Sequence, residues 1–266
     1  MQWDDIIKKS EISKTTPKQI LREDMQKTIL TSFSQEGFFE KIVFQGGTAL
    51  RLFYNNPRFS EDIDLVYRKD IKKTTINIAS LKIKKFIEEN YSYLNNIKFT
   101  SQKDDQYINR TNLKTYGDNP SQNIQINIEL AKVPSYHNQP RILEFPPLNP
   151  AVRVEEEKEI LADKITALGC RSYIKGRDLW DIYFLIKEKN LSISWDLVQK
   201  KVKDYNFSTE HFNNRLKEKK EEIKINGEKV LSNELKRFLA QSVYQQYVGM
   251  FKEILTIINE KISKIL

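Results

Sequence analysis

Two acidic residues with the right spacing for metal chemistry, Asp62 and Asp64, are separated by one residue. In an extended strand the side chains of residues i and i+2 point to the same face, so these carboxylates would repel each other. A divalent cation compensates such a pair well, because Mg²⁺ takes oxygen ligands and shares its coordination shell with substrate phosphates. For this pair alone the alternative stays open that both acids face solvent on an edge strand or loop.

The segment Gly46-Gly47-Thr48 lies between an apolar run, Ile42-Val43-Phe44, and a segment with the pattern of a short helix. Glycines allow backbone N–H groups to approach an anion closely, and a helix N-terminus adds a favourable dipole. The Thr48 hydroxyl would donate one more hydrogen bond to a phosphate. The alternative is an ordinary turn between a strand and a helix.

A third acid, Glu129, lies in the clearest alternating segment of the chain, where Ile124, Ile126, Ile128 and Leu130 alternate with polar residues. This period of two predicts a strand with one polar face. If this strand neighbours the strand of Asp62 and Asp64, three carboxylates converge. Such a group can hold one or two Mg²⁺ ions, and one member can help to deprotonate an attacking hydroxyl. The alternative is that Glu129 only keeps an outer sheet face polar.

The composition restricts the chemistry to carboxylates, lysines and arginines. Among 266 residues there are one cysteine and two histidines, which excludes a disulfide framework and argues against a metal site based on histidine or cysteine. No apolar run is long enough for a membrane span and the first residues do not resemble a signal peptide, so we expect a cytoplasmic protein. The formal net charge of +8 is compatible with a polyanionic partner.

These residues must be positioned by an α+β fold. The patterns predict helices over 17–36, 48–53 and 78–94, strands over 42–44, 62–67 and 124–130, and a hairpin or loop over 99–120. Four prolines between residues 140 and 150 suggest a domain boundary. We therefore expect a domain over 1–150 with a mixed sheet, and a helical domain over 151–266 that completes the active-site cleft and includes helical segments over 232–264.

Basic and aromatic residues gather in three segments, 67–73, 82–85 and 107–114. Phosphates attract lysine and arginine, and exposed aromatic rings stack on bases, so these segments could form an RNA-binding face. The alternative is a solvated surface in a lysine-rich protein.

The run from Phe44 to Leu65, FQGGTALRLFYNNPRFSEDIDL, resembles the signature of nucleotidyltransferases with the DNA polymerase β fold. Its details resemble the bacterial AbiEii/AbiGii branch, the toxins of type IV toxin–antitoxin and abortive-infection systems. The later segments ILADKITAL and KGRDLWDIY, within residues 160–185, resemble two further motifs of that branch, a helical lysine and an Arg-Asp pair.

The resemblance assigns roles to individual residues of this chain. It implies that Gly46, Gly47 and Thr48 hold a nucleoside triphosphate. It implies that Asp62 and Asp64 hold Mg²⁺ or Mn²⁺, with Glu129 as a third candidate ligand, although the branch often has a basic residue where this chain has Asn127.

Two residues of the C-terminal half, Lys164 and Asp178, are also assigned by the resemblance, the first to phosphate or base contacts and the second to activity. The helical pattern places Lys164 near the buried stripe, so it needs a charge partner such as Asp178, Asp181 or a phosphate. Alternatively, Lys164 is a surface lysine and Asp178 only favours the start of a helix. Arg58 would either contact the triphosphate or brace Glu61.

The expected activity is therefore the transfer of a nucleoside monophosphate from a triphosphate to an acceptor hydroxyl, with release of pyrophosphate. The resemblance favours the 3′ end of tRNA as the acceptor, a role as a growth-inhibiting toxin, and a cognate antitoxin as a partner. We expect a monomer. Two alternatives stay open: a non-catalytic module that binds nucleotide or RNA, and a nucleotidyltransferase that modifies a protein or a small molecule.

Overall fold

The chain forms two compact units in the computed structural model, which describes residues 2–70, 76–78 and 81–266. Unit 1 comprises Met1–Asn55 and Phe59–Glu155, and unit 2 comprises Asn56–Arg58 and Glu156–Leu266. The chain therefore passes from one unit to the other at three peptide bonds. Unit 1 contains a mixed sheet with helices and unit 2 is helical, which confirms the α+β class.

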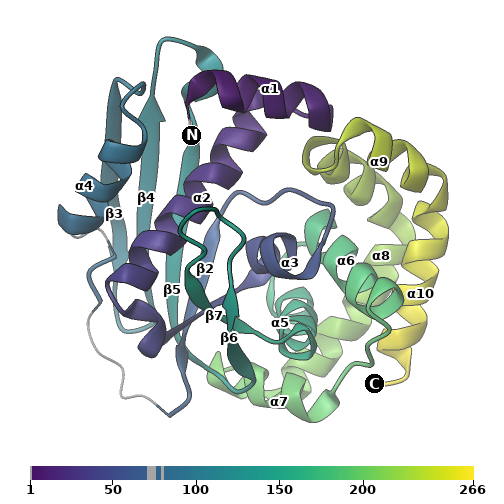
Figure 1. Ribbon diagram of the computed structural model, residues 1–266. Coiled ribbons are helices and arrows are strands. Elements are labelled where there is room, and N and C mark those ends of the chain that lie inside the picture. Colours follow the sequence, from purple (N-terminus) through teal and green to yellow (C-terminus); the bar gives the residue numbers. More distant parts are fainter. Residues whose placement is uncertain (1, 71–75, 79–80) are drawn as a thin grey trace. The chain divides into compact units, whose positions relative to one another are not determined.

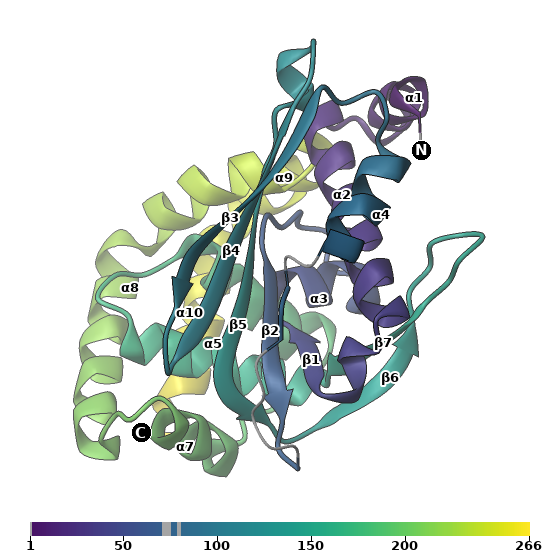
Figure 2. The same cartoon turned by 90° about the vertical axis from the view of Figure 1, so that its left-hand side faces the viewer.

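A seven-stranded sheet with the order β3-β4-β5-β2-β1-β7-β6 is the framework of unit 1 (Figure 2). Two strand pairs are parallel, β2 with β5 and β1 with β7, and the other neighbours are antiparallel. The strands are β1 (Ile42–Gln45), β2 (Ile63–Arg68), β3 (Asn96–Asp104), β4 (Ile108–Tyr116), β5 (Gln125–Ser135), β6 (Asn138–Ile142) and β7 (Ala151–Glu155).

Helix α2 (Pro17–Gln35) packs on this sheet and contacts β5 and β7 (Figure 1). Proline is favoured in the first turn, where its missing N–H has no helical acceptor, and Thr16 caps the helix by accepting from the Gln19 N–H at 3.2 Å. The expected helix over 17–36 is thus confirmed. The other elements of unit 1 are α1 (Trp3–Ser13), η1 (Phe38–Glu40), α3 (Gly46–Tyr54), α4 (Leu81–Asn90) and η2 (Pro120–Gln122).

Three expected elements differ in extent from the structure. Helix α3 begins at Gly46, two residues before the expected start, with Gln45 as its N-cap, so Thr48 lies inside the first turn. The helix expected over 78–94 is α4, and part of that expectation, residues 79–80, lies outside the described residues. The segment expected as hairpin or loop is the antiparallel hairpin β3–β4.

Helices build unit 2 around a core that includes Leu161, Ile165, Leu179, Leu231 and Ile258, all fully buried. The expected C-terminal helices correspond to the end of α8 and to α9 and α10. The elements are α5 (Glu157–Cys170), α6 (Gly176–Tyr183), the π-helical turn η3 (Phe184–Glu188), α7 (Trp195–Asp204), α8 (Thr209–Phe238), α9 (Gln241–Tyr247), η4 (Val248–Met250) and α10 (Phe251–Ser263). Across the residues that the structure describes, none of the helices has the length and apolarity needed to span a membrane.

A buried ion triad joins α7 to α5 in unit 2. The ammonium of Lys201 lies 2.5 Å from a carboxylate oxygen of Glu159 and 3.1 Å from one of Asp163. The side chains of Lys201 and Glu159 are almost completely buried, so their opposite charges compensate each other away from water.

Candidate active site

The turn between β1 and α3 lies directly against the carboxylate of Asp64. Gly46 has a φ of 79°, in the left-handed region, and a Cβ atom on it would lie 2.5 Å from Asp64 Oδ2. The register that pairs Gln45 with Asp64 produces this close approach. Only glycine fits here, because any side chain would meet both backbone strain and the carboxylate. The structure therefore brings the glycine turn and one acid of the predicted pair together.

Thr48 has a different contact from the one predicted. Its side chain is fully buried and its hydroxyl donates to the main-chain carbonyl of Asp62. A hydroxyl has one proton, so the predicted donation to a phosphate is not made in this arrangement. The bond instead ties the first turn of α3 to the residue that precedes β2.

The first turn of α3 also presents backbone donors. Gly46, Gly47 and Thr48 are its first three residues, whose N–H groups have no acceptor within the helix. The side chain of the N-cap residue, Gln45, does not cap the helix. This helix start can therefore bind an anion.

The strands that carry the three predicted acids are neighbours, as the convergence of these acids requires. β2 pairs with β5 in parallel, and Asp64 lies opposite Glu129. Asn127 donates from Nδ2 to Asp62 Oδ1 at 2.9 Å, and Asn112 of β4 donates to Asn127 Oδ1 at 2.8 Å. Two amides in series thus fix the orientation of the Asp62 carboxylate.

Glu129 has a basic partner on the adjacent strand. Arg110 Nε of β4 lies 2.8 Å from Glu129 Oε1, and both side chains are partly exposed. This pair agrees with the alternative in which Glu129 belongs to a polar outer face. A metal contact by Glu129 would require the carboxylate to be shared with Arg110 or released from it, and remains a prediction.

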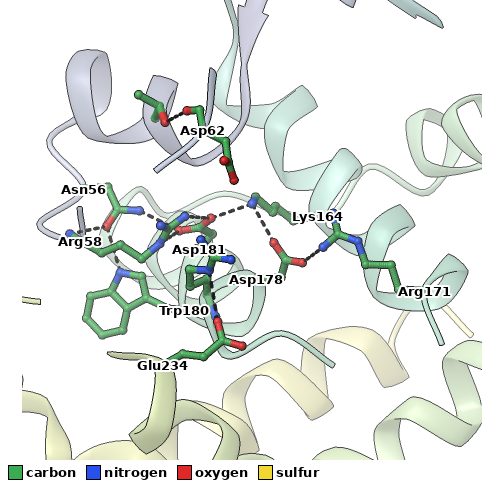
Figure 3. A network of polar contacts seen from close by, with 11 residues as sticks. Asn56, Arg58, Asp62, Lys164, Arg171, Asp178, Trp180, Asp181 and Glu234 are labelled. Carbon is green, nitrogen blue, oxygen red and sulfur yellow. Dashed lines mark hydrogen bonds and ion pairs between the residues drawn. The ribbon is translucent and has the colours of Figure 1, made fainter. Parts of the chain in front are cut away.

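In unit 2, Lys164 of α5 contacts two carboxylates of α6 (Figure 3). Its Nζ lies 2.8 Å from Asp178 Oδ1 and 2.8 Å from Asp181 Oδ2, and 14% of its side chain is exposed. The expectation that this lysine needs Asp178 or Asp181 as a charge partner is confirmed with both. The alternative was a salt-bridging lysine on the surface; Lys164 does form salt bridges, but its side chain is mostly buried.

The charges of this cluster set its protonation. Burial disfavours the Lys164 ammonium, but Asp178 and Asp181 outweigh that effect and raise its pKa. Burial also disfavours the Asp178 carboxylate, but Lys164 and Arg171 outweigh it and lower the pKa of Asp178 to about 2. The pKa of Asp181 is lowered too, since Arg58 and Lys164 outweigh its burial. Lys164 therefore stays a cation at neutral pH and does not act as a base.

Asp181 was expected from the sequence only as a candidate partner of Lys164, and its further contacts were missed. It is fully buried and accepts from Arg58 Nε at 2.8 Å, from Arg58 Nη2 at 2.6 Å and from Asn56 Nδ2 at 2.9 Å. Trp180 Nε1 in turn donates to Asn56 Oδ1 at 2.9 Å. One signal was available: Asp178 and Asp181 are three residues apart on a helix, a spacing that places both on one face.

Arg58 has an acidic partner of its own. Its side chain is 2% exposed and Asp181 contacts its guanidinium. The expected contact of Arg58 with a triphosphate stays a prediction. Glu61, the acid that Arg58 was alternatively expected to brace, pairs with Arg22 at 3.1 Å. The remaining arginines of interest also have acidic partners: Arg171 contacts Asp178, and Arg177 lies 3.2 Å from Glu234.

A mixed sheet in which a strand–glycine turn–helix unit lies against Asp64 agrees with the nucleotidyltransferase class that the sequence resemblance implies. Residues 28–259 match the family model described as nucleotidyl transferase AbiEii toxin of type IV toxin–antitoxin systems. The chain therefore belongs to the AbiEii family and is a nucleotidyltransferase.

Two crystal structures from Helicobacter pylori have a similar fold. JHP933 shares 20% sequence identity with a TM-score of 0.57, over 94% of this chain and 95% of that protein. A protein described as a candidate nucleotidyltransferase shares 20% identity with a TM-score of 0.56, over 92% of this chain and 96% of that one. A comparison with curated proteins finds no match.

Proposed function

We propose that this nucleotidyltransferase moves a nucleoside monophosphate from a triphosphate to the 3′ end of tRNA, with Mg²⁺, and that it acts as a toxin held in check by a cognate antitoxin. The observation that carries the proposal is the contact between the Gly46 backbone and the Asp64 carboxylate. It joins an anion-binding helix start to a pair of acids, which are the two parts that phosphoryl-type transfer requires.

The start of α3 is suited to the terminal phosphates of the triphosphate. The N–H groups of Gly46, Gly47 and Thr48 would donate to phosphate oxygens, and the positive end of the helix dipole would favour their charge. The Thr48 side chain serves indirectly, because its bond to the Asp62 carbonyl fixes this turn relative to the acids.

The residues present fit a divalent cation. Asp62 and Asp64 offer the hard oxygen donors that Mg²⁺ prefers, and the missing side chain at Gly46 leaves room for the Asp64 carboxylate. When bound, the ion would neutralise phosphate charge and polarise the reacting phosphoryl group. Asn127 keeps the Asp62 carboxylate in one orientation, which lowers the cost of arranging the donors.

Two residues of unit 2, Lys164 and Asp178, retain the roles that the family resemblance implies, as predictions. The raised pKa of Lys164 supports a role as a permanent cation for phosphates. Two of its three N–H donors point to carboxylates, so one donor is left for a further acceptor. Asp178 keeps that ammonium charged and in place.

Labelled-nucleotide transfer tests this function directly. Each of the four labelled triphosphates is incubated with native protein, total tRNA and Mg²⁺, with EDTA in a parallel reaction. We expect label on tRNA from one or more nucleotides, no label with EDTA, and loss of more than about 100-fold in D62N and D64N, since one preorganised electrostatic interaction contributes about 10²–10³. D4N, which changes an exposed aspartate of α1, is the matched control and should retain full activity.

Three outcomes contradict parts of the proposal. Label on added protein or small molecules, with none on RNA, would show that the acceptor is not RNA. Triphosphate binding without transfer to anything would favour a non-catalytic module. Equal transfer by the native protein and by D62N or D64N would show that the substituted aspartate does not hold the metal ion.

A further inference from the structure

Two exposed lysines face each other directly across the β3–β4 hairpin. Lys98 of β3 is the cross-strand partner of Lys114 of β4. Like charges in directly opposite positions destabilise a sheet. Among the residues that the structure describes, no acidic side chain forms an ion pair with either lysine. The fold therefore tolerates an unfavourable pair at this position.

The same hairpin contains a second pair of like charges, in which each member is compensated. Lys103 lies opposite Arg110. Lys103 Nζ is 2.9 Å from Asp105 Oδ2, and Arg110 Nε is 2.8 Å from Glu129 Oε1. By contrast, Lys98 and Lys114 have no acidic partner among the described residues, so both charges are available to an anion from outside.

An exposed aromatic ring lies beside the lysine pair. Tyr116 is two residues beyond Lys114 on β4, so both side chains are on the same face of the sheet, and 43% of Tyr116 is exposed. In the described part of the chain no other aromatic ring stacks on it. Proteins bind single-stranded nucleic acid with groups of this kind, placing phosphates at cations and a base on an exposed ring.

The strand register connects this face to the paired aspartates. Lys114 lies opposite Gln125, and Asn112 opposite Asn127, which contacts Asp62. The side chains of β4 and β5 at these positions share a face with Asp64 and Glu129. With strands about 4.8 Å apart and a rise of about 3.4 Å per residue, Lys114 lies about 12 Å from Asp62 in the same sheet. Figure 2 shows β4, β5 and β2 side by side.

We propose that Lys98, Lys114 and Tyr116 bind the single-stranded segment of the nucleic acid that carries the acceptor hydroxyl. The lysines contact its phosphates and the tyrosine ring stacks on one of its bases. The identity of this strand as the acceptor rests on the proposed function, whereas binding of a single strand to this face can be measured independently. RNA and DNA share this chemistry, so both are probes in the test.

Fluorescence anisotropy with labelled strands of about ten nucleotides measures the binding at several salt concentrations. For a single strand, each phosphate contact adds about 0.7 to the steepness with which the logarithm of the association constant falls with the logarithm of salt concentration. We therefore expect K98Q and K114Q each to reduce this steepness by about 0.7, and the double variant to reduce it by about 1.4. K18Q, which removes an exposed lysine of α2 without an ion pair, is the matched control and should leave the slope unchanged.

Tyrosine variants test the base contact. Stacking on an aromatic ring contributes about 1–3 kcal/mol per base, which corresponds to a loss of about 5- to 150-fold in Y116A. Y116F keeps the ring and should keep most of the affinity.

A charge reversal separates binding from a merely structural role. K98E places a glutamate opposite Lys114 and should raise the urea midpoint of unfolding while it weakens binding of the strand. A residue needed only for folding would change both in the same direction.

The proposal is overturned if the double lysine variant binds strands with the native affinity and slope, or if duplexes or a polyglutamate peptide bind this face more tightly than a single strand. Native protein that binds strands through this face but transfers no nucleotide would refute the proposed function and leave the face assigned. Transfer that continues unchanged in a variant whose strand binding is also unchanged would refute the face alone.

Discussion

Replacing Asp181 by asparagine should destabilise the protein strongly, although the two side chains have nearly the same shape. The carboxylate is fully buried and accepts from Arg58, Lys164 and Asn56 at 2.6–2.9 Å. In D181N an NH2 group replaces one of the two carboxylate oxygens, so N–H groups face N–H groups at that position and the Arg58 guanidinium loses its compensating negative charge inside the protein.

The magnitude follows from the burial of both partners. Side chains of Arg58 and Asp181 are 2% and 0% exposed, so water does not replace the lost interaction. Removing one partner of such a pair costs about 3–5 kcal/mol. The free energy of unfolding of a typical domain is about 5–15 kcal/mol, so the variant should lose a large part of its stability. With a denaturant slope of about 2 kcal/mol/M, the urea midpoint should fall by about 2 M.

The assay is equilibrium unfolding in urea, followed by circular dichroism and by tryptophan fluorescence, which includes Trp180 beside the cluster. E234Q is the matched control: it also removes one carboxylate that contacts an arginine, but 27% of the Glu234 side chain is exposed. Such a partly solvated pair should cost about 0–1 kcal/mol. In a double-mutant cycle with R58M, the double variant should lose less than the sum of the singles, by about 0.5–3 kcal/mol.

A loss below about 1 kcal/mol in D181N, equal to that in E234Q, would refute this reasoning. It would mean that solvent reaches the cluster or that Arg58 finds another acceptor. Additive losses in the cycle would show that Arg58 and Asp181 are not coupled and would remove the ion pair as the cause.

Three further predictions concern single positions. G46A should lower the free energy of unfolding by at least about 1–2 kcal/mol and abolish nucleotide transfer, because the φ of Gly46 is 79° and the new Cβ would displace Asp64. G249A is the control and should do neither, because the space around Gly249 is open. The pKa of Asp178 is lowered from 3.8 to about 2 in the folded protein, so its carboxylate stabilises the fold above pH about 4. About 2 kcal/mol of the free energy of unfolding should be lost as pH falls from 4 to 2. Urea unfolding at a series of pH values should show a weaker dependence of stability on pH in D178N. K201M should cost about 3–5 kcal/mol by thermal or urea unfolding, since it leaves two carboxylates of α5 without their cation; a loss under about 1 kcal/mol would contradict this.

The parts of the site that could be predicted from sequence are those defined by local patterns. The alternation around Glu129 predicts a strand because side-chain direction in a strand has a period of two, and β5 confirms it. The apolar run before Gly46 predicts a strand that leads into a turn, and β1 followed by α3 confirms that. These features depend on neighbours a few residues away, which the sequence contains directly.

The parts that could not be predicted depend on partners far along the chain. Arg58 and Asp181 are separated by 123 residues, and Arg58 has several other acids nearer in sequence. The Thr48 hydroxyl contacts a main-chain carbonyl, which any residue at position 62 would provide. Asn127 became a partner of Asp62 only through the register of β2 and β5. Spacing and residue type do not specify such choices, because tertiary packing decides them.

The position of Arg58 in the sequence gives its buried pair a consequence beyond stability. Arg58 precedes Asp62 by four residues, a span of at most about 14 Å of chain. Asp62 is itself held from two sides, by Thr48 at its carbonyl and by Asn127 at its carboxylate. The segment between these anchors is too short to absorb a large movement, so release of Arg58 in D181N should disturb Asp62 while the donors at the start of α3 stay intact. We therefore expect D181N, at a temperature where it remains folded, to lose transfer rate much more than affinity for the triphosphate. Equal losses in rate and affinity would indicate general unfolding and would contradict a positioning role for the pair.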